Sequence, residues 1–322
     1  MPQHQVLITD HPWPGIEIEQ QLLKPYGVEI IDAPDESEAT LARLAQNVDA
    51  IATCWAKVTS KVIQAAQVCR IVCRMGIGLD NIHIPTATSK GILVTNTPDY
   101  CVNEVADHAL GLLLAVTRNI GFFHHRTKGQ EYNLRAGPTM HRLRGRTLGL
   151  FGFGKTGQQM AQRAQACGLK VIACTPSGND YGTGCQMVSF DELLETADYL
   201  SLHSPLTEQN YHAFSTAAFD RMKDGVVIVN TARGSLIDPA ALYDAIQVGK
   251  VAGAGLDVFE PEPPDLSSPL YQDERVIATP HAAFISEESL IEMRETVAHQ
   301  IAAVLSGDRP ENVVNPEVLQ GA

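Results

Sequence analysis

The sequence predicts an α/β protein with two doubly wound parallel-sheet domains. The chain has 322 residues, and at roughly 150 residues per domain two domains are expected. Short apolar runs of β type alternate with amphipathic stretches from the first residues onward, which is the pattern of βαβ units. A glycine-rich turn, LFGFGKTG, follows the first strand of a second such series. Together these observations predict one parallel sheet in each domain.

The N-terminal series predicts a small sheet of five strands. These strands are expected at residues 6–9, 28–31, 50–53, 71–73 and 92–95. Helical patterns fall between them, at residues 16–24, 38–45 and 62–66. Helices in these positions would return the chain to the next parallel strand.

A long apolar stretch at residues 101–117 separates the two series. It is apolar on nearly all sides, which predicts a helix buried between larger bodies. The second series follows, with strands expected at residues 147–151, 170–174, 199–202, 226–230, 253–256 and 276–278. Six strands are the number in a complete dinucleotide-binding sheet.

The last apolar pattern, after Phe284, predicts a helix that begins with Ser286 as N-cap. No strand follows this helix in the sequence. It can instead rejoin the N-terminal domain, which would make that domain discontinuous.

Composition and charge exclude several classes of protein. Hydrophobic residues make up 44% of the chain and charged residues 19%, and no run reaches the roughly 18 to 20 apolar residues of a membrane span. A net charge of −13 opposes binding to nucleic acid. The start, MPQHQVLITD, does not resemble a secretory signal. The seven cysteines form no CxxC pair, so we expect buried thiols and a cytoplasmic protein.

The glycine-rich turn predicts a phosphate-binding site. Gly152, Gly154 and Gly157 lie between an expected strand and an expected helix at residues 156–167, so the turn with Lys155 and Thr156 can face a pyrophosphate. The glycine spacing alone is weak support, and the strand and helix around it strengthen the prediction. Thr175 stands where sites that prefer NAD carry an acidic residue.

Three segments of the second series carry an arginine, two carboxylates and a histidine. Arg233, Asp257 with Glu262, and His281 each follow an expected strand, so they should lie along one edge of the sheet. Arginine can hold a carboxylate with two hydrogen bonds, and histidine can transfer a proton near neutral pH. A carboxylate beside the histidine would favour its charged form.

These segments resemble the D-isomer-specific 2-hydroxyacid dehydrogenase family. The resemblance rests on RMGIGLDNI, LFGFGKTG, SLHSPLT, VNTARGSLID, AGLDVFEPEPP and TPHAAFISEES, which span nearly the whole chain. The run NTPDYCVNEVADHALGLLLA is most similar to the branch of the C-terminal-binding-protein-like dehydrogenases. The resemblance implies a flavodoxin-like substrate domain, residues 1–99 and 285–322, interrupted by a Rossmann NAD(P)-binding domain, residues 100–284.

The resemblance also implies roles for individual residues. Arg233 would bind the substrate carboxylate and polarise the keto oxygen, His281 would be the acid and base, and Glu262 its partner. Arg74, Met75, Gly76, Ile77 and Gly78 would meet the substrate carboxylate with their backbone amides. Asp257 would orient the nicotinamide. The remaining cofactor contacts would come from His203, Pro205, Thr231, Ala232 and His281.

The sequence departs from the family pattern at three places. Thr175 replaces the acidic residue of the ribose site, so NADP(H) should be accepted beside NAD(H). Phe284 stands where a tryptophan is common, and Asp107 replaces a glutamate. His124 with His125, and Glu104 with His108, have no third ligand at helical spacing, so no metal is expected.

The expected activity is the NAD(P)H-dependent reduction of a 2-keto acid to a D-2-hydroxy acid. A corepressor-like protein that senses NADH, and a phosphite-type dehydrogenase, are alternatives. Trp55, in the loop after the third strand, is expected to line the substrate pocket, or else to lie in the domain core. The apolar helix and the arm at residues 121–144, which has no strand of its own, predict a homodimer.

Overall fold

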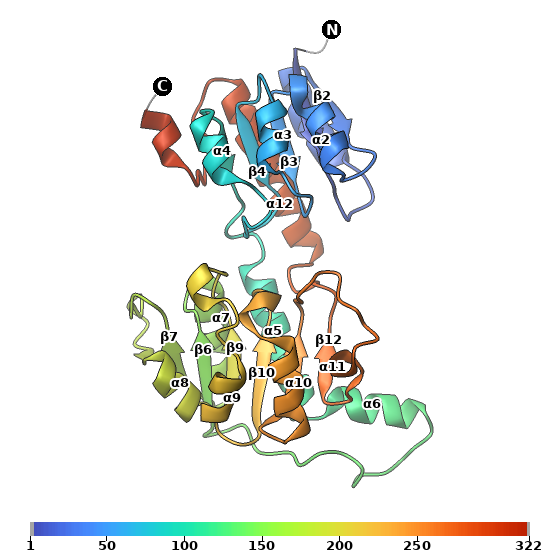
Figure 1. The fold of residues 1–322 in the computed structure, drawn as a ribbon, viewed down its shortest axis with the longest axis vertical. Helices are drawn as coiled ribbons and strands as arrows, with labels where there is room; N and C mark the ends of the chain where they lie inside the picture. The colour runs from blue at the N-terminus through green and yellow to red at the C-terminus, as the bar shows by residue number, and fades with distance from the viewer. Residues whose placement is uncertain (1–2, 321–322) are drawn as a thin grey trace. The chain divides into compact units, whose positions relative to one another are not determined.

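The computed structural model describes residues 3–320, and these divide into two compact units. We call Met1–Cys101 with Ser286–Ala322 the split unit, and Val102–Ile285 the inserted unit. Each contains one parallel sheet with helices, so the predicted fold class is confirmed (Figure 1).

The split unit has a five-stranded sheet in the order β2-β1-β3-β4-β5, the order of flavodoxin-like folds. Its strands are β1 (His4–Ile8), β2 (Val28–Asp32), β3 (Ala50–Thr53), β4 (Ile71–Arg74) and β5 (Leu93–Thr95). Its helices are α1 (Glu17–Leu23), α2 (Glu38–Leu44), α3 (Ser60–Ala65), α4 (Ile84–Ser89) and α12 (Glu287–Leu305). All five strands were predicted, whereas α4 was missed.

Helix α12 returns the chain to the split unit, where it lies beside the N-terminal elements (Figure 1). Ser286 is its N-cap and accepts the Ser289 N–H at 2.9 Å, as predicted. Arg294 forms a buried ion pair with Glu19 of α1 at 2.6 Å. Asn315, beyond the helix, accepts the Val94 N–H of β5 at 2.8 Å. The C-terminal segment is thus joined to the first domain by specific polar contacts as well as by packing.

The inserted unit has a sheet in the order β12-β11-β10-β9-β6-β7-β8, which is the Rossmann order with one additional strand. Its strands are β6 (Thr147–Phe151), β7 (Lys170–Cys174), β8 (Gln186–Met187), β9 (Tyr199–Leu202), β10 (Val226–Asn230), β11 (Val251–Leu256) and β12 (Val276–Ala278). Its helices are α5 (Val102–Thr117), α6 (Ile120–Lys128), α7 (Lys155–Ala166), α8 (Phe190–Thr196), α9 (Thr216–Arg221), α10 (Pro239–Gln247) and α11 (Pro269–Gln272). The predicted count of six strands was wrong, because this sheet has seven. The missed strand, β8, has only two residues and gives little sequence signal.

Burial explains why these segments form a parallel sheet. Every residue of β10, VVIVN, is buried, as expected for a strand covered by helices on both faces. Helix α5 packs on β10 and β11, and a side chain added at Gly255 would meet Leu112 of α5 at 2.8 Å. The absence of a side chain on β11 therefore lets the long apolar helix approach closely.

One smaller expectation needs correction. Five cysteines are buried, but Cys167 and Cys185 are only half-buried. The arm at residues 121–144 was expected to have no strand of its own, and its first residues belong to helix α6. Within residues 3–320, no helix is both long and apolar enough to cross a membrane.

Candidate active site

The carboxyl edge of the inserted sheet brings together the three predicted catalytic segments. Arg233 follows β10, Asp257 follows β11 and His281 follows β12, and these three strands are neighbours in the sheet. The ends of parallel strands meet at one edge, which is where ligands bind in open α/β sheets.

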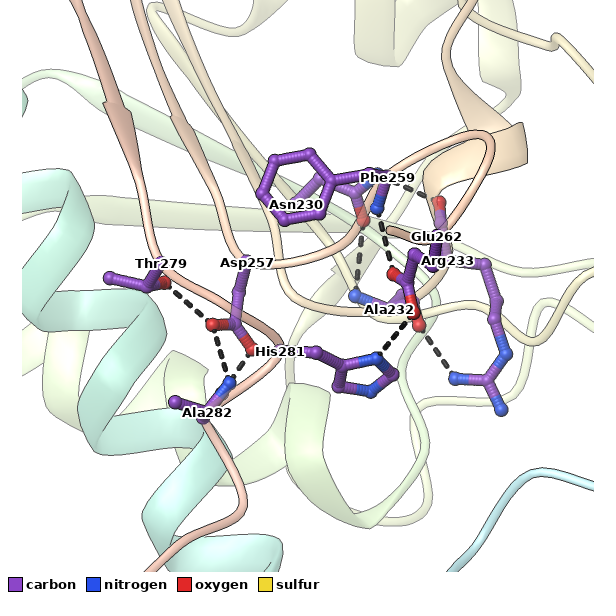
Figure 2. Close-up of polar contacts among 10 residues, drawn as sticks. Asn230, Ala232, Arg233, Asp257, Phe259, Glu262, Thr279, His281 and Ala282 are labelled. Carbon is purple, nitrogen blue, oxygen red and sulfur yellow. Dashed lines mark hydrogen bonds and ion pairs between the residues drawn. The ribbon is translucent and has the colours of Figure 1, made fainter. Parts of the chain in front are cut away.

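A hydrogen-bonded histidine–carboxylate pair forms the centre of this edge. His281 Nδ1 lies 2.8 Å from Glu262 Oε2, and the other carboxylate oxygen accepts the Phe259 N–H at 2.8 Å. Figure 2 shows the side chains of His281 and Arg233 on two sides of the Glu262 carboxylate. Burial disfavours the charged carboxylate, but the hydrogen bond and charge of His281, with the Phe259 N–H and the Arg233 charge, hold the pKa of Glu262 below its ordinary value. Glu262 is therefore an anion at neutral pH.

The backbone of His281 adopts an unusual conformation. Its φ is +51°, in the left-handed region that residues other than glycine rarely occupy. The His281 N–H donates to the carbonyl of Asp257 at 2.8 Å and to that of Thr279 at 2.9 Å. Such strain is maintained only where the surroundings determine the conformation, and it is frequent at functional sites.

Asp257 anchors the loop that carries His281. It is fully buried, and its carboxylate accepts the Thr279 hydroxyl at 2.6 Å and the N–H groups of Ala282 and Ala283 at 2.9 Å each (Figure 2). His108 of α5 continues the network, with Nε2 at 2.9 Å from the Thr279 hydroxyl. Sequence reasoning gave Asp257 a contact with the nicotinamide and missed this anchoring role, which depends on backbone amides brought by the tertiary fold.

Asn230 is a second residue that sequence reasoning missed. It is buried at the end of β10, its Oδ1 accepts the Ala232 N–H at 3.0 Å, and its Nδ2 donates to the Arg233 carbonyl at 2.8 Å. The signal was present, because a buried asparagine at the end of an apolar strand must find hydrogen-bond partners. Its two bonds fix the turn that carries Arg233.

The three glycines of the LFGFGKTG turn have different surroundings. A Cβ on Gly152, whose φ is +99°, would lie 2.5 Å from the His203 backbone, and one on Gly157 would lie 2.6 Å from the Gly152 carbonyl. A Cβ on Gly154 would meet nothing within 4 Å. Gly152 and Gly157 thus serve close packing, while Gly154 leaves open space at the start of α7. This arrangement fits a pyrophosphate at the helix N-terminus.

Two further observations fit a bound dinucleotide. The Thr231 hydroxyl is buried and has no hydrogen-bond partner within residues 3–320, so it is available to a ligand in the turn where a cofactor contact was predicted. Desolvation lowers the pKa of His203 to about 4, so this histidine is neutral at pH 7. Its Nε2 lies 2.8 Å from the Ser201 hydroxyl. The His203 backbone therefore packs against Gly152, and its neutral side chain adds no positive charge to the glycine-rich turn.

In the split unit, the predicted substrate segment follows β4. The Met75 N–H donates to the Thr53 carbonyl at 2.8 Å and the Gly76 N–H to the Arg74 carbonyl at 3.0 Å. The Met75 side chain is buried, and the Arg74 guanidinium donates to the Met75 carbonyl. Within residues 3–320, the amides of Ile77 and Gly78 donate no hydrogen bond. Of the residues 74–78 that were predicted to bind the substrate carboxylate, Ile77 and Gly78 are therefore the two whose amides are available to it.

Trp55 follows β3 at the same edge of that sheet, and its side chain is 39% exposed. It is not part of the domain core, which was the other reading of this residue. The buried carboxylate of Asp10 accepts the Cys54 N–H at 2.9 Å and the Trp55 N–H at 2.6 Å. Asp10 thus fixes the backbone of the loop that presents the exposed ring.

Comparison with known proteins identifies the family. The model of the NAD binding domain of D-isomer specific 2-hydroxyacid dehydrogenases matches residues 110–283. The chain is 36% identical to a glyoxylate reductase of Korarchaeum cryptofilum, over 90% of this chain and 86% of the reductase. This chain belongs to the D-isomer-specific 2-hydroxyacid dehydrogenase family.

Other members of the D-2-hydroxyacid dehydrogenase family support this assignment. A hydroxypyruvate reductase of Thermotoga maritima is 43% identical over 72% of this chain and 76% of its own. A crystal structure of a glyoxylate reductase from Paecilomyes thermophila matches with a TM-score of 0.89 at 29% identity, covering 98% of this chain and 100% of the other. The chain is therefore an oxidoreductase of the NAD-dependent 2-hydroxyacid dehydrogenase type.

The turn after β7 (Lys170–Cys174) carries Thr175, where the sequence predicts the ribose of the cofactor to bind. Thr175 Oγ1 accepts the Gly178 N–H at 3.1 Å, and the Asp180 carboxylate accepts the N–H groups of Gly182 at 3.1 Å and Gly184 at 3.0 Å. These two backbone bonds hold the pKa of Asp180 below its ordinary value. Asp180 is therefore charged and bonded within its own loop.

We expect this turn to discriminate weakly between the two nicotinamide cofactors. Thr175 does not repel a 2′-phosphate as an acidic residue would, and the segment CTPSGND supplies no Arg or Lys to attract one. Both cofactors should work, with NADH favoured by about 10-fold or less, which is about 1.4 kcal/mol. Catalytic efficiencies for NADH and NADPH at a fixed keto acid measure this preference.

The variant Thr175→Asp provides the matched comparison, because it restores the acidic residue and should raise the preference for NADH. A wild-type preference above about 10³-fold, or about 4 kcal/mol, would show that a charged group from elsewhere reaches the ribose.

Proposed function

We propose that this dehydrogenase reduces a small 2-keto acid to the D-2-hydroxy acid. The observation that carries the proposal is the His281–Glu262 pair at 2.8 Å, with Arg233 beside it at the same sheet edge (Figure 2). A proton donor, its anionic partner and a carboxylate-binding cation are the groups that carbonyl reduction needs.

Each residue has a distinct task in the proposed reaction. Arg233 binds the substrate carboxylate and polarises the keto oxygen with its guanidinium. Protonated His281 donates its proton to that oxygen as negative charge develops there. Glu262 stabilises the imidazolium, and its lowered pKa keeps it ionised for this task. The nicotinamide cofactor supplies the hydride that reaches C2 of the substrate.

The split unit contributes to substrate binding in this proposal. The amides of Ile77 and Gly78 donate hydrogen bonds to the substrate carboxylate, and the loop with Trp55 adjoins the substrate side chain. In this proposal the split unit supplies backbone amides and the Trp55 loop for the substrate, and the inserted unit supplies the cofactor contacts together with Arg233, Glu262 and His281.

A panel of keto acids with both reduced cofactors tests the proposal. Glyoxylate, hydroxypyruvate, pyruvate, phenylpyruvate and 2-ketoisocaproate span a useful range of side-chain sizes. We expect reduction of at least one of the smaller acids, and the product should be the D-isomer when it is chiral. Binding of NADH with no turnover of any acid, or oxidation of phosphite in its place, would contradict the proposal.

The exposed ring of Trp55 should limit the size of the substrate side chain. Removing it with Trp55→Ala frees volume, so the efficiency for phenylpyruvate relative to glyoxylate should rise by about 10-fold. Tyr26→Ala is the control, because Tyr26 is also exposed (38%) but precedes β2, at the opposite edge of the sheet. An unchanged ratio in Trp55→Ala would rule out the pocket role.

We also propose that the inserted unit forms a homodimer. Its arm exposes Tyr132 (87%) and Leu134 (81%), and apolar groups this exposed need a partner surface. Light scattering at micromolar concentration should give about twice the chain mass of 34.9 kDa. Leu134→Asp should shift the protein toward the monomer, whereas a wild-type mass near that of one chain would refute the dimer.

A further inference from the structure

A second histidine–carboxylate pair lies in the inserted unit, and the proposed mechanism does not use it. His212 Nε2 is 2.6 Å from Glu260 Oε2, and the Tyr211 hydroxyl donates to Glu260 Oε1 at 3.2 Å. The Tyr211 and His212 rings stack with centroids 4.0 Å apart. The Glu260 carboxylate thus has two side-chain partners, which are neighbours in one other segment of the chain.

Glu260 is charged in this arrangement. Burial opposes the anion, but the hydrogen bonds from His212 and Tyr211, with the charge of His212, hold the pKa of Glu260 below its ordinary value. The side chains of His212 and Glu260 are 27% and 29% exposed. The pair is therefore partly shielded from water, where charge-assisted hydrogen bonds are stronger than at an open surface.

The partners of Glu260 flank the turn that carries Arg233. The His212 N–H donates to the Ser235 carbonyl at 2.8 Å, and the Phe214 N–H donates to the Leu236 carbonyl at 3.0 Å. Residues 212–214 therefore run alongside residues 235–236, directly after Arg233. His212 has a φ of +49°, an unfavourable conformation for a residue with a side chain, and its contacts with Ser235 and Glu260 hold it there.

Glu260 itself belongs to the loop that carries Glu262. This loop meets the Arg233 turn through direct backbone packing, because a Cβ on Gly234 would lie 2.0 Å from the Phe259 carbonyl. The Phe259 N–H in turn donates to Glu262 at 2.8 Å. The side chain of Glu260 therefore links, through His212, the two segments that carry Arg233 and Glu262, beside the point where their backbones touch.

We propose that Glu260, bonded to His212 and Tyr211, is a positioning residue that sets the spacing between Arg233 and the Glu262–His281 pair. This inference rests on the proposed function, since it assigns Arg233 to the substrate and the pair to proton transfer. Misplacing a catalytic group by about 1 Å can lower a rate by about 100-fold. The Glu260 carboxylate restricts such a displacement, because it bonds His212, whose N–H donates to the Ser235 carbonyl in the turn after Arg233.

The test compares steady-state kinetics of Glu260→Ala and Glu260→Gln with the wild type. Glu260→Ala should lower kcat/KM for the best keto acid by about 10-fold to 100-fold. Glu260→Gln keeps one acceptor oxygen and should lose less. The KM for NADH should stay within about 2-fold for both variants, because the LFGFGKTG turn lies on other elements. Glu274→Ala is the matched control, since the Glu274 carboxylate pairs with Arg126 at 2.9 Å in the same unit, and Arg126 belongs to α6, which carries no residue of the candidate site.

A double-mutant cycle separates positioning from a general loss of stability. In an Arg233→Ala background, Glu260→Ala should lower kcat/KM by no more than about 3-fold, because the group that it positions is gone. A Glu260→Ala effect below about 2-fold in the wild type, or an equally large effect in both backgrounds, would overturn the inference. If Glu260→Ala does not fold, Glu260→Gln and His212→Asn are measured in the same cycle with the same criteria. A wild-type protein that reduces no keto acid would instead overturn the proposed function, and this inference with it.

Discussion

Replacing His281 with alanine should lower kcat for keto-acid reduction by about 10² to 10⁴, the usual contribution of a positioned general acid. The loss should appear mainly in kcat, because the imidazole donates its proton only as charge develops on the keto oxygen. Binding of NADH, followed by its fluorescence, should change much less than kcat, because His281 would be only one of several cofactor contacts. His299→Ala is the control, since His299 is an exposed histidine of α12.

The role of His281 also predicts how the pH dependence of the reaction changes when Glu262 is replaced. Glu262→Gln removes the negative charge beside His281, so the imidazolium loses its stabilising partner, and reduction should decline at a lower pH than in the wild type. A pH profile of kcat/KM for both proteins measures this shift. A His281→Ala enzyme with wild-type turnover at every pH would remove His281 from the mechanism.

The regular elements were largely predictable because their burial follows simple patterns. Strands such as β3 and β10 are continuous buried runs bounded by polar residues, which the alternation of apolar and amphipathic stretches reveals. Helix α4, IPTATS, is rich in β-branched residues that disfavour helices. Helix α6 (Ile120–Lys128) has Asn119 as its N-cap, but no side-chain hydrogen bond caps it. The local signals for helices α4 and α6 are therefore weak.

The candidate site was predictable in its membership but not in its geometry. Parallel strands end at one edge, and this rule was enough to group Arg233, Glu262 and His281. No spacing rule gives a distance of 2.8 Å between side chains that are 19 positions apart in sequence. The Asp257 carboxylate is anchored by the N–H groups of Ala282 and Ala283, which are 25 and 26 positions away, so only the folded chain reveals these bonds.

The strained backbone at His281 is also beyond a sequence prediction. The segment TPHAAF contains no glycine to signal a positive φ, and histidine adopts one only occasionally, yet the His281 φ is +51°. Two carbonyls and the buried carboxylate of Asp257 hold this conformation. The surrounding network therefore sets the direction of the imidazole, and the local sequence does not.

Replacing Arg233 with alanine should raise the KM for the keto acid and also lower kcat, because the guanidinium binds both the ground state and the developing charge. Each hydrogen bond to a charged group contributes about 1.5 to 3 kcal/mol, so losing the two that Arg233 makes should lower kcat/KM by about 100-fold or more. Arg233→Lys keeps the charge but not the two parallel hydrogen bonds, and should recover only part of this loss. Arg221→Ala is the control, because Arg221 forms surface ion pairs with Asp191 and Glu195.

The Arg233 variant should also change the acid side of the pH profile. The positive charge of Arg233 is one of the influences that lower the pKa of Glu262. Without it that pKa rises, so Glu262 takes up a proton at a higher pH and ceases to support the imidazolium. As the pH falls, Arg233→Ala should therefore lose activity at a higher pH than Arg233→Lys, which retains the charge. Coinciding acid limbs for the two variants would show that Arg233 does not act on Glu262. A KM and kcat of Arg233→Ala within about 3-fold of the wild type would show that it does not act on the substrate.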